Sequence, residues 1–211
     1  MPQPAAVVLK PRKSPVQARS AASVEAILDA TIQVLLAVGK ERLTTTRVAA
    51  RAGVSVGTLY QYFPNKSALL QASLKRHLDA VTDAIERVCA LQQGAPLRTM
   101  TSALIQAFLA TKMRDTRVST ALYLVSSDLD AAGIVRGSRG RAHKAITQML
   151  VSSSEPLSTD PAVVASLLHG MMVGVSRNLL ESPSPAKHLD RTRQELIVAA
   201  CSYVEACAKV A

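Results

Sequence analysis

Residues 43–70 constrain the fold more than any other stretch, because they contain two short helical runs separated by a glycine. Thr44 suits the N-cap of the first run, since its hydroxyl can accept a hydrogen bond from a free backbone N–H. Val48, Ala49 and Ala52 then recur at helical spacing. The first run is therefore predicted to be a helix with one small apolar face.

The turn between the two runs centres on Gly53. A helix often ends at a residue in the left-handed conformation, which only glycine adopts without strain. Ser55 can cap the second run, whose Leu59 and Phe63 point back toward the first. Two helices joined by a glycine-containing turn predict a helix-turn-helix.

The outward side of the second helix carries methyl, hydroxyl and amide groups that suit base edges and phosphate oxygens. Pro64 ends this helix and Asn65 can cap the next one. Lys66 then puts a positive charge beside free N–H groups, where a phosphate can bind. A plain helical hairpin with its tyrosines in the core is the alternative, but the polar neighbours and basic flanks favour a binding surface. The outward residues are Val56, Gly57, Thr58, Tyr60, Gln61 and Tyr62.

At these positions the chain resembles the TetR family of bacterial one-component repressors. The resemblance extends upstream through the helix predicted at about 20–39, so it covers about the first third of the chain. Many relatives have histidine where this chain has Tyr62, a change that keeps a donor able to reach a phosphate. The matching residues are Thr44, Thr45, Ala49, Ala52, Gly53, Val54, Ser55, Gly57, Thr58, Leu59, Tyr60, Tyr62, Phe63, Pro64, Lys66, Leu69 and Leu70.

The resemblance implies a DNA-binding transcriptional regulator, a homodimeric repressor of a palindromic operator that a small molecule releases. We expect Thr45, Tyr60, Tyr62 and Lys66 to contact phosphates. The candidates for base edges are Val56, Gly57, Thr58 and Gln61, together with Thr46 or Arg47. The full expected DNA-binding set is Thr44, Thr45, Thr46, Arg47, Ser55, Val56, Gly57, Thr58, Tyr60, Gln61, Tyr62 and Lys66.

The net charge of +10 is concentrated near this motif. Residues 1–80 hold 11 Lys and Arg against 4 Asp and Glu, a net of +7, whereas the remaining 131 residues hold 14 against 11, a net of +3. A basic excess beside a helix-turn-helix is what a DNA-binding surface requires. Charge alone would fit a membrane surface equally well.

The rest of the chain reads as helices separated by breaker clusters, with no alternating β pattern and no internal repeat. The family resemblance implies the same all-α layout. We assign a disordered basic arm to 1–19, the helix-turn-helix domain to 20–66, a connecting helix to 67–91, and an effector-binding and dimerisation domain to 92–211. The arm either enters the minor groove or adds only long-range attraction. Further helices are predicted at about 21–38, 66–91, 97–112, 115–127, 137–153, 161–181 and 187–209.

Cysteine usage and apolar runs indicate a soluble cytoplasmic protein. Cys89, Cys201 and Cys207 are an odd number without metal-ligand spacing, so we expect three small core residues; a redox-sensing pair is the alternative. The start of the chain has no basic segment followed by a long apolar one. The longest apolar run, Ala162–Val175, is interrupted by polar residues and is shorter than the ~20 residues that span a bilayer.

Catalytic signatures are absent, which argues against the second class considered, an all-α enzyme with an incidental helix-turn-helix. One SxxK match, Ser184–Lys187, lies in a proline-rich break without its partner motifs. We expect no cofactor and no metal. Residues 136–144 form a basic cluster that is either a solvated helix start or a site for an anionic effector or a phosphate. A DNA-binding protein without an effector is the third class, but the apolar C-terminal region is larger than dimerisation needs.

The C-terminal region should therefore hold an effector pocket and a dimer interface. Methionines and arginines favour an apolar or weakly anionic effector, although each residue could equally fill the core. Candidate effector-binding residues are Met100, Leu104, Phe108, Met113, Arg114, Arg117, His169, Met171, Met172 and Asn178. In TetR-like proteins the last two helices pair with those of a second copy, so the expected interface includes Ala165, Gly170, Gly174, Leu196, Ala199 and Tyr203.

Overall fold

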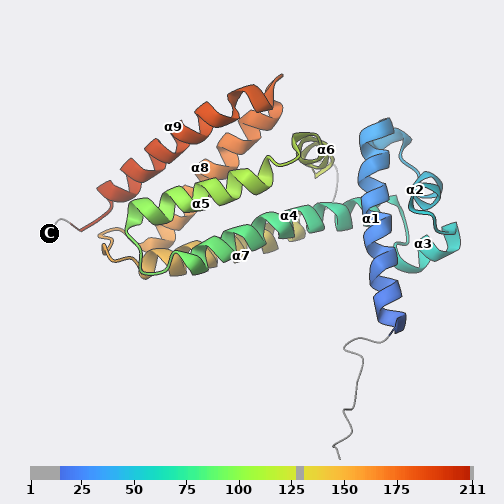
Figure 1. Ribbon diagram of the computed structural model, residues 1–211, viewed down its shortest axis with the longest axis horizontal. Coiled ribbons are helices and arrows are strands. Elements are labelled where there is room, and N and C mark those ends of the chain that lie inside the picture. The colour runs from blue at the N-terminus through green and yellow to red at the C-terminus, as the bar shows by residue number, and fades with distance from the viewer. Residues whose placement is uncertain (1–14, 127–130, 210–211) are drawn as a thin grey trace, which may run out of the picture. The chain divides into compact units, whose positions relative to one another are not determined.

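The computed structural model describes residues 15–126 and 131–209 and confirms the all-α prediction for them (Figure 1). Within these ranges no β-strand forms, and Leu157 and Ala208 make a single isolated bridge. The chain divides into two compact units between Leu69 and Leu70, a point that lies inside α4. The helices are α1 Pro15–Arg42, α2 Thr45–Ala52, α3 Val56–Tyr62, α4 Lys66–Leu91, α5 Leu97–Lys112, α6 Thr116–Ser126, α7 Ala132–Val151, α8 Pro161–Glu181 and α9 Pro185–Ala206.

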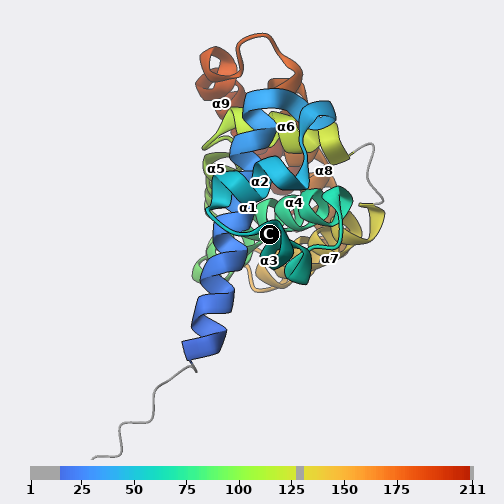
Figure 2. The ribbon, with the colours of Figure 1, turned by 90° about the vertical axis from the view of Figure 1, so that its right-hand side faces the viewer.

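The first unit, which we call the head, is built on α1. Helix α2 packs against α1, and α3 packs against α2 (Figure 2). The apolar sides of these helices meet in one core, as the spacing of small and branched residues predicts. The buried Thr31 hydroxyl donates to the carbonyl of Ile27 at 2.8 Å, so it leaves no unpaired polar group there. The core residues of the head include Ile27, Leu28, Val34, Leu35, Leu43, Val48, Ala49, Leu59 and Phe63.

The first helix differs from its predicted start. It begins at Pro15, so residues 15–19 are helical and do not belong to an arm; residues 1–14 lie outside the described chain. Proline is well suited to a first helical turn, because its φ is already helical and its missing N–H is not needed there. The predicted end at Gly39 is confirmed as a break, since its φ of 76° and ψ of 169° are not helical.

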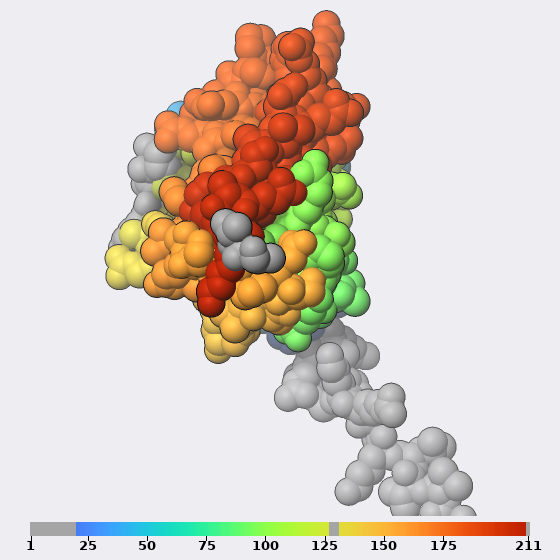
Figure 3. Space-filling view, turned by 90° about the vertical axis from the view of Figure 1, so that its left-hand side faces the viewer, coloured from blue at the N-terminus to red at the C-terminus, as the bar shows by residue number. Residues whose placement is uncertain are grey.

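The second unit, which we call the body, has a core made mainly of leucine, methionine and valine. Helix α5 packs on α9, α7 on α8, and α8 on α9. Figure 3 shows the face of the body on which α9 runs beside α5. Aliphatic side chains supply most of this packing, because only 3% of the residues are aromatic. Core residues include Leu97, Met100, Leu104, Ile105, Leu109, Ile146, Met149, Val164, Leu168, Met172 and Val204.

Helix α7 begins at Ala132, five residues before its predicted start at 137. The predicted range of 137–153 leaves Gly133 outside the helix. In the structure this glycine lies in the first turn of α7, with no other group near it. A glycine costs little at a position where few intrahelical contacts form, so the helix starts before it.

Two helices, Ser20–Arg42 and Pro161–Glu181, are long and apolar enough to cross a membrane by length and composition alone. The second has 21 residues, so the length argument made from its apolar run does not hold. Both helices nevertheless contribute buried side chains to their own units, such as Ile27 in the head and Leu168 in the body. A core helix of a soluble protein meets the same criterion.

The three cysteines are free thiols buried in the body, as predicted from their number and spacing. Burial, and then the nearby charge of Glu86, raise the pKa of Cys89 to about 12, so this thiol stays protonated at neutral pH. Each cysteine therefore packs as a small apolar residue.

Candidate DNA-binding motif and ligand cavity

The turn of the helix-turn-helix has the predicted caps. The Thr44 hydroxyl accepts a hydrogen bond from the backbone N–H of Arg47 at 3.2 Å. Gly53 ends α2 with φ 69° and ψ 27°, in the left-handed region that favours glycine. The Ser55 hydroxyl accepts from the backbone N–H of Thr58 at 3.0 Å and so caps α3. These local contacts hold α2 and α3 in one defined arrangement.

A hydroxyl pair joins the exposed sides of α2 and α3. The Thr45 hydroxyl and the Tyr60 phenol lie 3.1 Å apart, although 15 positions separate the two residues in the chain. Tyr60 remains 48% exposed and Val56 36% exposed, so neither is a core residue. The alternative of a helical hairpin with Tyr60 in its core is therefore wrong. The motif presents one continuous surface of hydroxyl, methyl and amide groups.

Gly57 leaves the backbone of α3 open on this surface. It lies in the first turn of α3, and an added Cβ would meet only the Ser55 Oγ atom, at 3.7 Å. That distance is ordinary van der Waals contact, so the packing of the head does not require a glycine here. The cost of a glycine in a first turn is smaller than the ~1 kcal/mol that it costs in a helix interior relative to alanine. The absence of a side chain instead leaves room for an external group to approach the backbone of α3.

Three cations of the motif are held by neighbouring groups of the head. Arg47 donates to the carbonyl of Arg42 at 2.8 Å, and Arg51 donates to the amide oxygen of Gln33 at 2.5 Å. The Lys66 ammonium donates to the carbonyl of Glu41 at 3.5 Å, a long and weak contact. None of these bonds neutralises a charge, so the three side chains remain cationic on the surface of the head.

The body contains a cavity of about 550 Å³, within the range of known small-molecule sites. Its walls come from five helices, α4 to α8. Most of the lining is apolar, and Phe108 of α5 is one of its buried members. The main apolar lining residues are Leu78, Val81, Ile85, Phe108, Val135 and Leu180.

All the charged side chains that line the cavity are cations. Lys112 comes from α5, Arg139 from α7 and Arg177 from α8, and His169 of α8 adds an imidazole. Among the described residues that line the cavity, none is Asp or Glu. Burial, and then the positive charge of Arg139, lower the pKa of His169. The His169 ring is therefore neutral at pH 7, and the positive charge of the lining rests on the other three residues.

Arg177 differs from the other two cations because it has a partner. Its Nε donates to Glu181 at 2.9 Å, and its guanidinium lies over the ring of Tyr123, 5.4 Å from the ring centre. The Tyr123 hydroxyl donates to the same carboxylate at 3.1 Å. This triangle ties α6 to α8 beside the cavity.

Lys112 makes no hydrogen bond or ion pair through its ammonium within the described chain. Burial lowers its pKa, because an apolar environment penalises the charged form. Burial, followed by the positive charges of Lys112 and Arg114, also lowers the pKa of His77 to about 4. His77 and Lys112 are therefore two neighbouring basic groups whose charged forms are disfavoured by burial.

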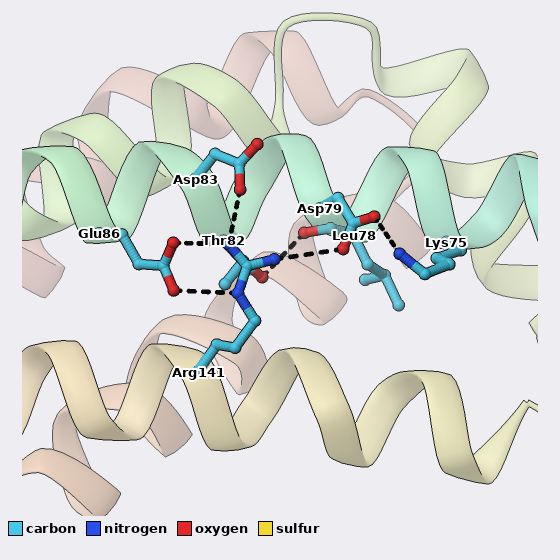
Figure 4. Close-up of polar contacts among 7 residues, drawn as sticks. All are labelled: Lys75, Leu78, Asp79, Thr82, Asp83, Glu86 and Arg141. Atoms are coloured by element: carbon cyan, nitrogen blue, oxygen red, sulfur yellow. Dashed lines mark hydrogen bonds and ion pairs between the residues drawn. The ribbon is translucent and has the colours of Figure 1, made fainter.

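Arg141 of α7 connects two of the helices that form the cavity wall (Figure 4). Its guanidinium makes two bonds to Glu86, at 2.9 and 2.5 Å, and one to Asp83 at 2.7 Å. A longer contact of 3.4 Å reaches Asp79, which also pairs with Lys75. The bonds to Glu86 and Asp83 raise the pKa of Arg141. All three acids stand on α4, so Arg141 ties α4 to α7.

Comparison with known proteins identifies the family. The model of "Bacterial regulatory proteins, tetR family" matches residues 27–73. The "Tetracyclin repressor-like, C-terminal domain" model matches residues 96–203, which is more than half of the chain. The chain belongs to the TetR family. It is a DNA-binding transcriptional regulator and not an enzyme.

Relatives of this TetR-family regulator match different shares of its length. The HTH-type transcriptional regulator BetI of Escherichia coli K12 is 26% identical over 173 residues, which cover 79% of this chain and 85% of BetI. BetI of Escherichia coli O45:K1 is 36% identical over 97 residues, 45% of this chain and 47% of that protein.

Solved structures share the fold. A TetR-family regulator from Mesorhizobium loti has a TM-score of 0.74 at 19% identity and covers 91% of this chain and 99% of its own. SmeT, the repressor of the Stenotrophomonas maltophilia multidrug efflux pump SmeDEF, has a TM-score of 0.69 at 23% identity and covers 88% and 90%.

The expected effector residues of this TetR-family regulator mostly do not line the cavity. Phe108 and His169 do, whereas Met100, Leu104 and Met172 are fully buried in the core. Met113 is also buried, Met171 packs against the core, and Arg114, Arg117 and Asn178 are exposed. Helical spacing assigns an apolar side chain to the buried face of its helix. It does not show whether that face packs in a filled core or lines a cavity. The cavity residues that the sequence analysis missed include Lys112, Tyr123, Arg139 and Arg177.

The basic cluster at 136–144, which the sequence analysis considered as a possible effector site, contributes one cation to the cavity and places its other basic residues elsewhere. Arg139 lines the cavity, while Arg141 pairs with acids of α4. His143 lies 3.1 Å from the carbonyl of Ala162. The sequence therefore marked this segment as unusual, but only the helical rotation of α7 decides which cation faces the cavity.

The expected dimer residues also separate into two groups. Ala165 and Leu196 are buried in the core of their own chain, at 0% and 5% exposure, so neither is available to a second copy. Tyr203 is half-buried against the same core. Ala199 is exposed, as are Gly170 and Gly174, which also line the cavity. Ala165 therefore lies on the buried side of α8, whereas Gly170 and Gly174 lie on its exposed side.

Proposed function

We propose that this TetR-family regulator is a homodimeric repressor that binds a palindromic operator through α3 and is released by a small molecule in the body cavity. One observation carries the proposal. Helix α4 begins at Lys66, directly after the helix-turn-helix, and the same helix lines the cavity from Leu78 to Ile85. A ligand that moves α4 therefore has a covalent route to the DNA-binding motif.

DNA contact falls to the exposed side of the helix-turn-helix. Tyr60, Tyr62, Thr45 and Lys66 reach phosphates in this proposal, and Val56, Gly57, Thr58 and Gln61 face base edges. The exposure of Val56 and Tyr60 and the open backbone at Gly57 support it. The cations Arg47 and Arg51 add attraction to the DNA backbone without reading its sequence.

A dimer follows from the small size of one recognition helix. Helix α3 has 7 residues and can read only a few base pairs, so specificity needs two half-sites at least a helical turn apart, ~34–36 Å. We assign the interface to the exposed sides of α8 and α9. Their large exposed apolar residues are Val163 at 49%, Leu167 at 47%, Val173 at 44% and Val198 at 57%.

The ligand can weaken DNA binding only to the extent that its affinity differs between the DNA-binding and the released conformation. The coupling free energy between two such sites is typically ~1–3 kcal/mol. SmeT, which shares this fold, is named as a repressor and also occurs as a complex with triclosan. A cavity of about 550 Å³ gives this chain room for a ligand of comparable size. The cavity also disfavours the second candidate, a DNA-binding protein without an effector. A cytoplasmic location follows from action on the operator.

The proposal is tested by fluorescence anisotropy with DNA from upstream of the protein's own gene. The purified protein should bind this DNA at least 100-fold more tightly than random DNA of equal length at the same salt concentration. Sedimentation of the complex should give two chains per palindrome. Equal affinity for both DNAs, or a monomer on the DNA, would overturn the proposal.

A further inference from the structure

The cations of the cavity are not balanced by acids from its own lining. Arg177 pairs with Glu181, but Lys112 and Arg139 make no ion pair within the described chain. A positive charge in a largely apolar site is stabilised when an anion binds beside it. A negatively charged ligand in this cavity would therefore pair with cations that have no acidic partner in the described chain.

Lys112 is a cavity cation that has no acidic partner among the described residues and whose charge burial disfavours. It lies at the end of α5, and its backbone carbonyl accepts from the Ser119 hydroxyl at 2.6 Å, which fixes the start of the side chain. Burial disfavours its charge, and the neighbouring His77 is a neutral ring that offers no compensation. A carboxylate beside this ammonium would restore the charged form and make a charge-assisted hydrogen bond.

Most of the remaining lining is apolar and favours an apolar ligand body, and Thr82, Ser138 and Ser176 add hydroxyl groups to it. Leu78, Val81 and Ile85 of α4 face the cavity together with Phe108 and Leu180. These side chains offer no hydrogen bonds, so a ligand with several polar groups would lose water there without replacement. The combination of one unpaired ammonium and a long apolar wall selects amphipathic molecules.

We propose that the effector is an amphipathic monoanion whose single carboxylate pairs with Lys112 and whose apolar body lies along α4. This inference rests on the proposed function, because it names the chemical class of the effector. It excludes quaternary ammonium ligands, which need a carboxylate or an aromatic cage. Phe108 and Tyr123 are the only aromatic rings in the described lining, and Tyr123 already carries Arg177.

Three ligands that share one ten-carbon chain test the head group directly. Decanoate, decanol and decyltrimethylammonium are titrated below their micelle-forming concentrations into the full-length protein by calorimetry. Decanoate should bind at least tenfold more tightly than decanol, and the ammonium compound should bind most weakly. Equal binding of decanoate and decanol, a preference for the ammonium compound, or no binding of decanoate overturns the inference.

A matched pair of lysine substitutions tests the partner. Lys112→Met keeps most of the unbranched side chain and removes its charged end, so decanoate affinity should fall at least tenfold while decanol affinity changes less than twofold. Lys187→Met, at an exposed position of α9 outside the cavity, should change neither. If Lys112→Met fails to fold, Lys112→Arg retains the charge and must keep the preference for decanoate. Unchanged decanoate affinity in a folded Lys112→Met protein overturns the role of Lys112.

The readouts separate this inference from the proposed function. Release of operator DNA by a neutral or cationic compound, without binding of carboxylates, overturns the inference and leaves the proposed function intact. Binding of decanoate by a protein that has no preferred DNA, or that keeps its operator when decanoate is bound, overturns the proposed function and leaves the ligand class intact.

Discussion

The helix-turn-helix and the body cavity arrange their functional groups in opposite ways. In the motif, the candidate groups lie between positions 44 and 66 and stand on the exposed sides of α2 and α3. The other sides of these helices form the core beneath them. In the cavity, the lining runs from Leu78 to Leu180 and comes from five helices. The motif is therefore a local feature of the chain, and the cavity is a product of tertiary packing.

This difference determines how easily function can be separated from stability. A substitution on the exposed side of α3 changes the binding surface without touching the core. A substitution at a cavity residue can disturb the core, because core residues are its neighbours in the same helix. Phe108, for example, lines the cavity, and the adjacent Leu109 is fully buried. Only lining residues with small or partly exposed side chains allow a clean test in the body.

Gly57→Leu should give the largest effect and would act on the motif alone. The new side chain meets nothing in the head beyond Ser55, so the melting temperature should stay equal or rise by a few degrees. If the backbone of α3 lies against DNA, operator affinity should fall at least 100-fold, about 2.7 kcal/mol. Anisotropy and calorimetric melting measure the two quantities. Undiminished affinity would show that DNA does not approach α3 at this position.

Ser138→Phe is the counterpart in the body. Ser138 is half-buried on α7 and lines the cavity. The phenyl ring of the variant would therefore fill part of the cavity without entering the core. The effector concentration for half-release of DNA should rise at least tenfold, while operator affinity stays within twofold of wild type. A titration of effector against the preformed DNA complex measures both values. A loss of operator affinity instead would mean that motif and cavity cannot be separated as described.

Lys66→Ala should have a smaller and uniform effect on DNA binding. The lysine makes only a long contact with Glu41, so its removal leaves the fold intact. One lost phosphate contact should weaken operator and random DNA alike, by about three- to tenfold, and flatten the salt dependence of log affinity by about one. Lys75→Ala, an exposed lysine further along α4 that pairs with Asp79, is the control and should change neither slope nor affinity. An unchanged salt slope for Lys66→Ala would remove this phosphate contact.

Arg141→Gln should give the smallest effect, because exposed ion pairs contribute only ~0–1 kcal/mol each. It releases the bonds to Glu86 and Asp83 that hold α4 to α7 (Figure 4). If α4 moves when effector binds, the concentration for half-release should fall about two- to threefold. Arg136→Gln, an exposed arginine on the same helix outside the cavity lining, serves as the control. An increase in the required effector concentration would contradict a movement of α4 away from α7.

The sequence by itself determined the helical fold, the helix-turn-helix and its caps. These features depend on neighbours in the chain: Thr44, Gly53 and Ser55 act on backbone groups within a few residues, so their roles can be read from spacing. The early starts of α1 and α7 were missed, because helix ends are set by small energies.

Only the tertiary structure decided which apolar and basic residues of the body form a site. Met100 and Phe108 are both apolar and both buried, yet only Phe108 lines the cavity. The cavity brings together three cations from three helices: Lys112, Arg139 and Arg177. The spacing of residues along one helix cannot predict this, because it carries no information about the other two helices. The physical reason is that side-chain periodicity defines the face of a single helix. The rotation and separation of packed helices, which open a cavity, depend on all their partners at once.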